Sequence, residues 1–146
     1  METKKMIGAW LGGFVAMFLL GYIWHTMIIS DYNAVQYADV LRPMADFSIV
    51  HIVIGYLVLA FIMSYIYPLG YKGGPFVKEG LRFGVILGLL YTLPGAFIYA
   101  GVYKMPLAAN ILDAAYHLVE MGVGGIIMAK IYGGESASSE GTEASE

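Results

Sequence analysis

Four long apolar segments constrain the fold of this chain more than any other feature. They cover residues 6–29, 47–68, 81–103 and 107–132, and polar or glycine- and proline-containing turns separate them. A helix of about 20 apolar residues crosses the hydrocarbon core of a bilayer. We therefore expect an all-α fold, an integral membrane bundle of four transmembrane helices that forms one domain over residues 1–132.

The composition excludes an ordinary soluble domain. Of the 146 residues, 59% are hydrophobic and only 13% are charged, whereas soluble chains carry about 25% charged residues. The net charge is −3 and much of the acid lies near the C-terminus, so no basic surface typical of nucleic-acid binding is present. The expected partner is the lipid bilayer. The chain has no cysteine, which excludes disulfides, thiolate metal sites and cysteine nucleophiles.

Both ends of the chain can be interpreted from their composition. The first apolar segment is longer than the core of about 7–15 residues in a signal peptide, so we expect it to remain as an anchor. Residues 133–146 combine Glu with Ser, Gly, Ala and Thr, a composition that buries too little apolar surface to fold. We predict a disordered acidic tail there.

The basic residues between the segments predict the orientation. With the N-terminus inside the cell, six of them are cytoplasmic and two are external: Lys4, Lys5, Lys72, Lys78, Arg82 and Lys130 against Arg42 and Lys104. Cytoplasmic loops of membrane proteins are enriched in Lys and Arg. The sequence thus predicts a multi-pass cell-membrane protein with both termini in the cytoplasm.

The fourth segment carries a polar stripe on an otherwise apolar helix. At about 100° per residue, five positions fall within roughly 80° of one another: Asn110, Asp113, His117, Glu120 and Gly124. An unpaired ionised carboxylate near the bilayer centre costs at least ~2.5–3.5 kcal/mol. The stripe must therefore face other helices, water or a ligand.

Depth brings further polar residues to the same half of the bundle. His25 lies about one turn before the outer end of the first segment, and His51 about one turn after the outer start of the second. Asp113 and His117 lie roughly 10 and 16 Å below the outer start of the fourth, at 1.5 Å per residue. We expect a cluster in the outer half, with Glu120 one turn deeper.

The third segment adds tyrosines to this cluster. Tyr91 and Tyr99 lie on roughly the same face of the helix, with Gly95 between them, so their hydroxyls are available to the same pocket. Pro94, next to Gly95, is expected to kink the helix.

These residue types fit more than one function. Imidazoles with carboxylates are the standard nitrogen and oxygen ligands of zinc and similar divalent metals. The metal-ligand candidates are His25, His51, Asp113, His117 and Glu120. The same side chains with Tyr91 and Tyr99 are equally typical of a proton relay, and an apolar cleft with a few polar groups also suits a small ligand or a haem. No motif for phosphate binding, a Ser-His-Asp triad, HExxH or an iron–sulfur cluster is present.

Glycines form close-packing patterns on two segments. Gly80, Gly84 and Gly88 are spaced i, i+4, i+8 on the third segment, and Gly8 and Gly12 form a pair on the first. Small residues at this spacing let a neighbouring backbone approach closely. We predict that these five positions pack helices.

Three functional hypotheses follow. The first is a small protein that binds or transports a divalent metal or protons. The second is a structural or accessory subunit, in which the polar stripe holds the bundle together and the glycines bind a second copy or another membrane protein. The third is a membrane enzyme acting on a lipid or quinone, with His117 and Asp113 as a base pair; enzymatic activity is the less expected outcome.

Three parts of the sequence carry a resemblance to a known group of proteins. The run LGGFVAMFLLGYIWHTMI, the glycine-rich third segment and the ending PLAANILDAAYHLVEMGVGGIIMAKIYG resemble small four-span bacterial membrane proteins of unknown function, of the DUF1761 and DUF2177 kind. The resemblance covers the layout from Met6 to Gly133, with Trp24-His25 where a Trp-Tyr pair is typical. It implies a four-helix membrane fold and no known activity.

Overall fold

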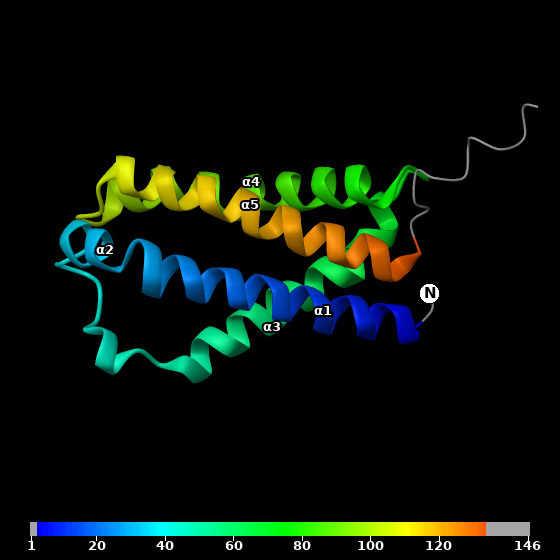
Figure 1. Ribbon diagram of the computed structural model, residues 1–146. Coiled ribbons are helices and arrows are strands. Elements are labelled where there is room, and N and C mark those ends of the chain that lie inside the picture. Colours follow the sequence, from blue (N-terminus) through cyan, green and yellow to red (C-terminus); the bar gives the residue numbers. More distant parts are fainter. Residues whose placement is uncertain (1–2, 134–146) are drawn as a thin grey trace, which may run out of the picture.

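The computed structural model describes residues 3–133, and over that range the chain is helical without any strand (Figure 1). The elements are α1 (Thr3–Tyr22), a π-helical turn (Ile23–Ile28), α2 (Ser30–Gln36), a 3-10 turn (Met44–Asp46), α3 (Ile49–Gly70), α4 (Phe76–Val102) and α5 (Leu107–Tyr132). Four helices, α1 with its π-helical turn, α3, α4 and α5, are long and apolar enough to cross a membrane. This confirms the predicted all-α membrane bundle. Of the acidic tail predicted at residues 133–146, Gly133 is described and caps α5, and residues 134–146 lie outside the described residues.

Some element boundaries differ from those expected. Helix α4 begins at Phe76, directly after Pro75, rather than at Leu81, and it continues past Pro94 as one helix. Helix α5 ends at Tyr132, where Gly133 adopts a left-handed conformation with φ 92° and donates its N–H to the last turn. Glycine is the residue that tolerates this conformation at a helix end.

Helix α5 lies in the middle of the bundle, between α4 and α1, and α3 packs on the other side of α1. A Cβ on Gly80 or Gly84 of α4 would overlap backbone atoms of α5, and a Cβ on Gly125 of α5 would overlap the Gly80 carbonyl. The two backbones therefore touch. On α1, Gly8 and Gly12 face Ile131 of α5.

The core between the four helices consists of small residues and methionines. Its fully buried members are Ala9, Met17, Ala60, Met63, Met121 and Met128. Methionine is flexible and fills the irregular gaps that small neighbours leave. Two hydrogen bonds join helices around this core: Trp10 Nε1 donates to the Leu57 carbonyl at 2.8 Å, and Tyr132 donates to the Ser64 carbonyl at 2.6 Å.

Helix α3 crosses α1 at an angle, so the two ends of the bundle differ (Figure 1). The end of α3 lies beside the start of α4, where the rings of Tyr67 and Phe83 meet edge to face at 5.1 Å. The start of α3 lies away from α4 and α5. The helices thus converge near Tyr67 and lie further apart near α2.

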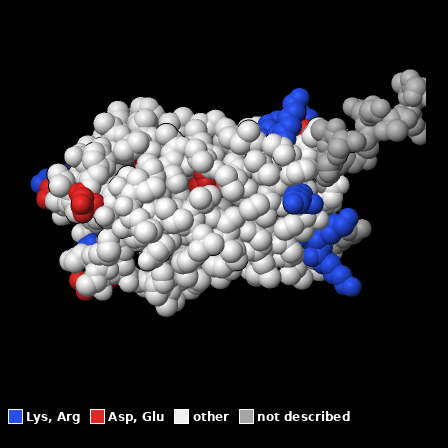
Figure 2. Space-filling model, viewed as in Figure 1, with Lys and Arg blue, Asp and Glu red and all other residues white. Residues whose placement is uncertain are grey.

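Charged residues are confined almost entirely to the two ends. Figure 2 shows a wide uncharged band between them, broken by acidic atoms at one place, with Lys and Arg gathered at the end where α1 begins. Such a band matches the hydrocarbon core of a bilayer. Near the basic end, Arg82 donates to Glu79 at 2.6 Å and to the Gly70 carbonyl at 3.0 Å, which ties the α3–α4 turn together.

Candidate metal centre

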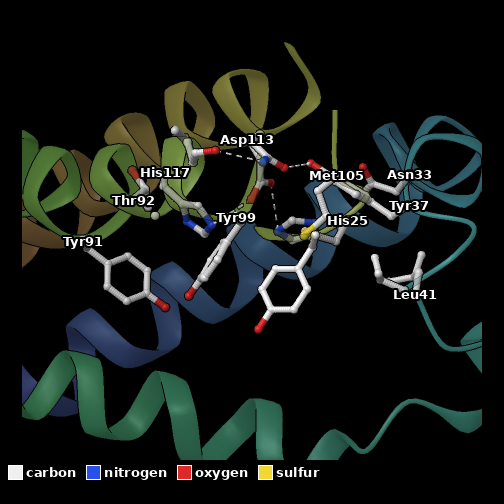
Figure 3. A pocket seen from close by; sticks show the side chains of 16 residues that line it. His25, Asn33, Tyr37, Leu41, Tyr91, Thr92, Tyr99, Met105, Asp113 and His117 are labelled. Carbon is white, nitrogen blue, oxygen red and sulfur yellow. Dashed lines mark hydrogen bonds and ion pairs between the residues drawn. The ribbon is translucent and has the colours of Figure 1, made fainter. Parts of the chain in front are cut away.

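A cavity with a volume of about 580 Å³ lies at the end of the bundle near α2. Its walls come from the π-helical turn, α2 and the loop after it, α4, and α5 (Figure 3). Among the residues that the structure describes, none from α3 lines it. His25, Asp113 and His117 all face this cavity.

The π-helical turn brings His25 to the site. The Ile29 N–H donates to the Trp24 carbonyl at 3.0 Å, one residue further back than in an α-helix. This wider turn shifts the angular position of the side chains that follow, and such turns occur frequently at functional sites. The Trp24 ring stacks on Tyr116 of α5 at 4.5 Å, and His25 meets the same ring edge-on at 5.9 Å. The turn is therefore fixed against α5.

Helix α5 supplies the other two members on one face. Asp113 and His117 are four residues apart and therefore neighbours on the helix surface. The distance from His117 Nε2 to Asp113 Oδ2 is 3.5 Å, and that from His25 Nε2 to Asp113 Oδ1 is 3.7 Å. Asp113 thus lies between the two imidazoles.

Glu120 orients His117 from the opposite side. Its side chain is fully buried, and Oε2 lies 2.6 Å from His117 Nδ1. Tyr56 of α3 donates to Oε1 at 2.7 Å, and Tyr116 also donates to Oε1 at 3.4 Å. With Nδ1 of His117 bound to a carboxylate, its Nε2 is directed toward Asp113 and the cavity.

The spacing of the three donors fits a metal ion. One donor atom from each of His25, Asp113 and His117 can be chosen so that all lie within 4.8 Å of one another. Two ligands of a tetrahedral zinc ion with bonds of about 2.0–2.1 Å lie roughly 3.3–3.4 Å apart. The 3.5 and 3.7 Å separations are close to this value and longer than a hydrogen bond of about 2.7–3.2 Å.

One carboxylate oxygen of the site also suits a cation. Within residues 3–133, Asp113 Oδ1 is buried without a hydrogen-bond partner. Buried polar atoms are nearly always paired, and an exception calls for a water or an ion. A cation among the three donors would satisfy Asp113 Oδ1.

Hydrogen bonds of Asn110 hold together the wall of the cavity nearest the loop after α2. Its amide donates to the Ala96 carbonyl of α4 at 3.0 Å, and its carbonyl accepts from Tyr37 at 3.1 Å. Burial raises the pKa of Tyr37 to about 12, with a smaller contribution from the Asp113 charge. Tyr37 therefore stays a neutral donor at physiological pH and joins the loop after α2 to α5.

The other predicted site residues occupy different places. His51 is exposed at the start of α3, where its Nδ1 lies 2.6 Å from the Ser48 hydroxyl, and it does not line the cavity. Glu120 lies outside the group of three donors and contacts it through His117. Tyr91 and Tyr99 line the cavity along α4, and the Tyr91 ring meets His117 edge-on at 6.0 Å.

Sequence reasoning missed four aromatic residues of the site: Trp24, Tyr37, Tyr56 and Tyr116. Tyr116 is adjacent to the polar stripe, and Trp24 is adjacent to His25, so proximity in sequence was an available signal for these two. No sequence pattern joins Tyr37 and Tyr56 to Asn110 and Glu120, because their contacts depend on how the helices pack.

Comparison of the chain with protein-family models, with curated proteins and with solved structures gives no match.

Proposed function

We propose that this membrane protein binds a divalent transition metal ion, zinc in the first instance, with His25, Asp113 and His117 as ligands. The observation that carries the proposal is the spacing of Asp113 Oδ1 and Oδ2 from the two Nε2 atoms, 3.7 and 3.5 Å. These two distances suit shared coordination of one ion better than direct hydrogen bonds.

The second contact of His117 supports the same function. Histidines that bind metals commonly donate their other ring N–H to a carboxylate, which fixes the tautomer and the ring orientation. Glu120 occupies that position at 2.6 Å from Nδ1. Three protein ligands leave a fourth position of a tetrahedral ion open, as in catalytic rather than purely structural zinc sites.

Binding is favoured over transport by the packing below the site. Toward the basic end, the centre of the bundle is filled by the buried methionines and alanines of the core. One turn deeper than His117, the Glu120 carboxylate is already bonded to His117, Tyr56 and Tyr116. Beyond it, an ion would meet no further polar ligand among these core residues. We propose that the ion is held and not conducted, and that the cavity faces the outside because the basic end is cytoplasmic.

Elemental analysis of the purified protein tests this function. We expect near-stoichiometric zinc after reconstitution, lost in His117→Ala and in Asp113→Asn. His51→Ala is the matched control, because it removes a histidine that lies apart from the donors. Zinc at equal levels in all four proteins, or in none, would contradict the proposal.

The second candidate function is proton transfer by the same residues. His117 lies between the two carboxylates Asp113 and Glu120, so the three side chains form a continuous row of groups that can exchange a proton. Flux measurements in liposomes separate the two: with a proton gradient and no added metal, a proton carrier changes the pH inside the vesicles, whereas a metal-binding protein moves neither protons nor zinc.

A further inference from the structure

We propose that a smaller cavity at the basic end of the bundle binds the phosphate group of an anionic phospholipid from the leaflet at that end. This basic-end cavity has a volume of about 150 Å³ and is lined by Tyr67, Pro68, Tyr71, Tyr132 and Gly133. It lies at the opposite end of the bundle from the three metal-ligand candidates. The proposal is therefore independent of the metal site.

Three helices contribute to the surroundings of the basic-end cavity. Tyr67 belongs to α3, and Tyr132 and Gly133 form the end of α5. The start of α1 lies at the same end (Figure 1), and a Cβ on Gly133 would lie 3.7 Å from Lys5 Nζ. Basic pockets between transmembrane helices on the cytoplasmic side are typical binding sites for anionic lipid heads.

The hydroxyl group of Tyr67 points to a ligand. Tyr67 is only 3% exposed, and within residues 3–133 its hydroxyl has no hydrogen-bond partner. The other two phenols of the cavity are paired. Tyr132 donates to the Ser64 carbonyl at 2.6 Å, and Tyr71 donates to the Gly74 carbonyl at 3.3 Å. Since buried polar atoms nearly always have a partner, a phosphate oxygen that accepts from Tyr67 would satisfy its hydroxyl.

The charge at this end favours an anion over a cation. Aromatic walls can also bind a cation through their ring faces. Among residues 3–133, however, this end carries six basic side chains and one acidic side chain, Glu79 (Figure 2). Glu79 accepts a hydrogen bond from Arg82 at 2.6 Å. A surplus of positive charge attracts anions and repels cations.

The position and size of the cavity indicate a lipid phosphate group. Tyr67 lies three residues before the end of α3, and Tyr132 is the last residue of α5. Lipid headgroups lie where the apolar spans end. Since a water molecule takes about 30 Å³, the cavity has room for a phosphate group but not for acyl chains, which remain in the bilayer.

Native mass spectrometry in a neutral detergent measures this binding, because it resolves the protein with one lipid bound. The full-length protein is titrated with dioleoylphosphatidylglycerol or with dioleoylphosphatidylcholine, which has the same chains and phosphate but no net charge. We expect the first phosphatidylglycerol to bind about fivefold or more tightly than the first phosphatidylcholine.

Removal of one hydroxyl group separates a specific site from general attraction. Tyr67→Phe keeps the ring that stacks on Tyr132 at 5.4 Å, and we expect it to bind phosphatidylglycerol about tenfold or more weakly. The matched control is Tyr65→Phe, on the same helix, where the ring is exposed and does not line the cavity. Neither substitution changes the charge, and circular dichroism verifies that both variants are folded.

Three results would overturn the proposal. The first is wild-type binding of phosphatidylglycerol by folded Tyr67→Phe, and the second is equal binding of the two lipids by the wild type. The third is displacement of the lipid by inorganic phosphate at equal concentration, because the cavity would then recognise the free anion. None of these results bears on the metal site, which elemental analysis tests separately.

Discussion

The position of the Glu120 carboxylate determines how the His117 imidazole is oriented. Glu120 is fully buried, yet Tyr56, Tyr116 and His117 surround it with polar partners. A buried charge is tolerated only when it is paired and hydrogen-bonded. These contacts also hold the imidazole with Nε2 toward the cavity, so the proposed role of Glu120 is to position a metal ligand.

Replacement of that carboxylate tests the positioning role. In Glu120→Gln the amide can present an N–H to Nδ1 of His117, which favours the tautomer with the proton on Nε2. We expect zinc affinity to fall about 10- to 100-fold, as for other changes behind a ligating histidine, while the stoichiometry at saturating zinc is kept. Calorimetric titration measures both quantities. Unchanged affinity would show that Glu120 has no such role.

A glycine makes room for the hydrogen bond between Tyr56 and Glu120. A Cβ on Gly21 would overlap the Tyr56 hydroxyl and lie 2.8 Å from Glu120 Oε1. We expect Gly21→Ala to lower the free energy of unfolding by about 1–3 kcal/mol. In Gly55→Ala, where a Cβ meets nothing within 4 Å, helix propensity predicts a gain of roughly 0.5–1 kcal/mol. Titration with a denaturing detergent compares the two, and equal effects would contradict the steric argument.

At the scale of elements, the glycine ridge of α4 is occupied within the chain. Gly80 and Gly84 touch the backbone of α5, and Gly88 lies against Leu118. Helices in lipid associate through close packing and not through a hydrophobic driving force. The ridge therefore joins α4 to α5, the helix that carries Asp113 and His117. Because α5 covers these glycines, no further partner can bind to them.

Filling the ridge is expected to separate these two helices. In Gly84→Ala the added Cβ would overlap the Met121 carbonyl, and backbone cannot move aside as a side chain can. We expect a loss of at least about 1–3 kcal/mol in the free energy of unfolding, with zinc binding lost in parallel. Gly101→Ala on the same helix serves as the control, since it adds a methyl group to open space. Equal stability of the two variants would rule out the close contact.

At the scale of the whole molecule, the orientation can be measured because the chain has no cysteine. Single cysteines at Asp39 and Lys104 mark the end with the cavity, and those at Lys72 and Lys78 mark the basic end. On intact cells, a membrane-impermeant maleimide is expected to label only the first pair, and all four after permeabilisation. Labelling of Lys72→Cys or Lys78→Cys on intact cells would contradict a cytoplasmic basic end.

The fold was more predictable from the sequence than the site. Long apolar segments and turns with proline and glycine are local signals, and they were sufficient for the four helices. Depth along the helices was also sufficient to place His25 near His117. Depth could not show that His51 lies apart from His25 and His117, because it does not predict the direction in which α3 runs. The contacts of Tyr37 and Tyr56 needed the packed structure for the same reason.

The π-helical turn at Ile23–Ile28 makes the proposed metal site depend on the number of residues in the chain as well as on their identity. The wider turn accommodates one extra residue, so removal of one residue would allow a regular α-helix to continue with the residues after the turn in the same phase. The side chains inside the turn, including His25, would change direction. His25 would then leave Asp113 although every ligand remained in the sequence. Between descendants of this chain, a one-residue gap before His25 would therefore mark the loss of the site more reliably than a substitution elsewhere in α1.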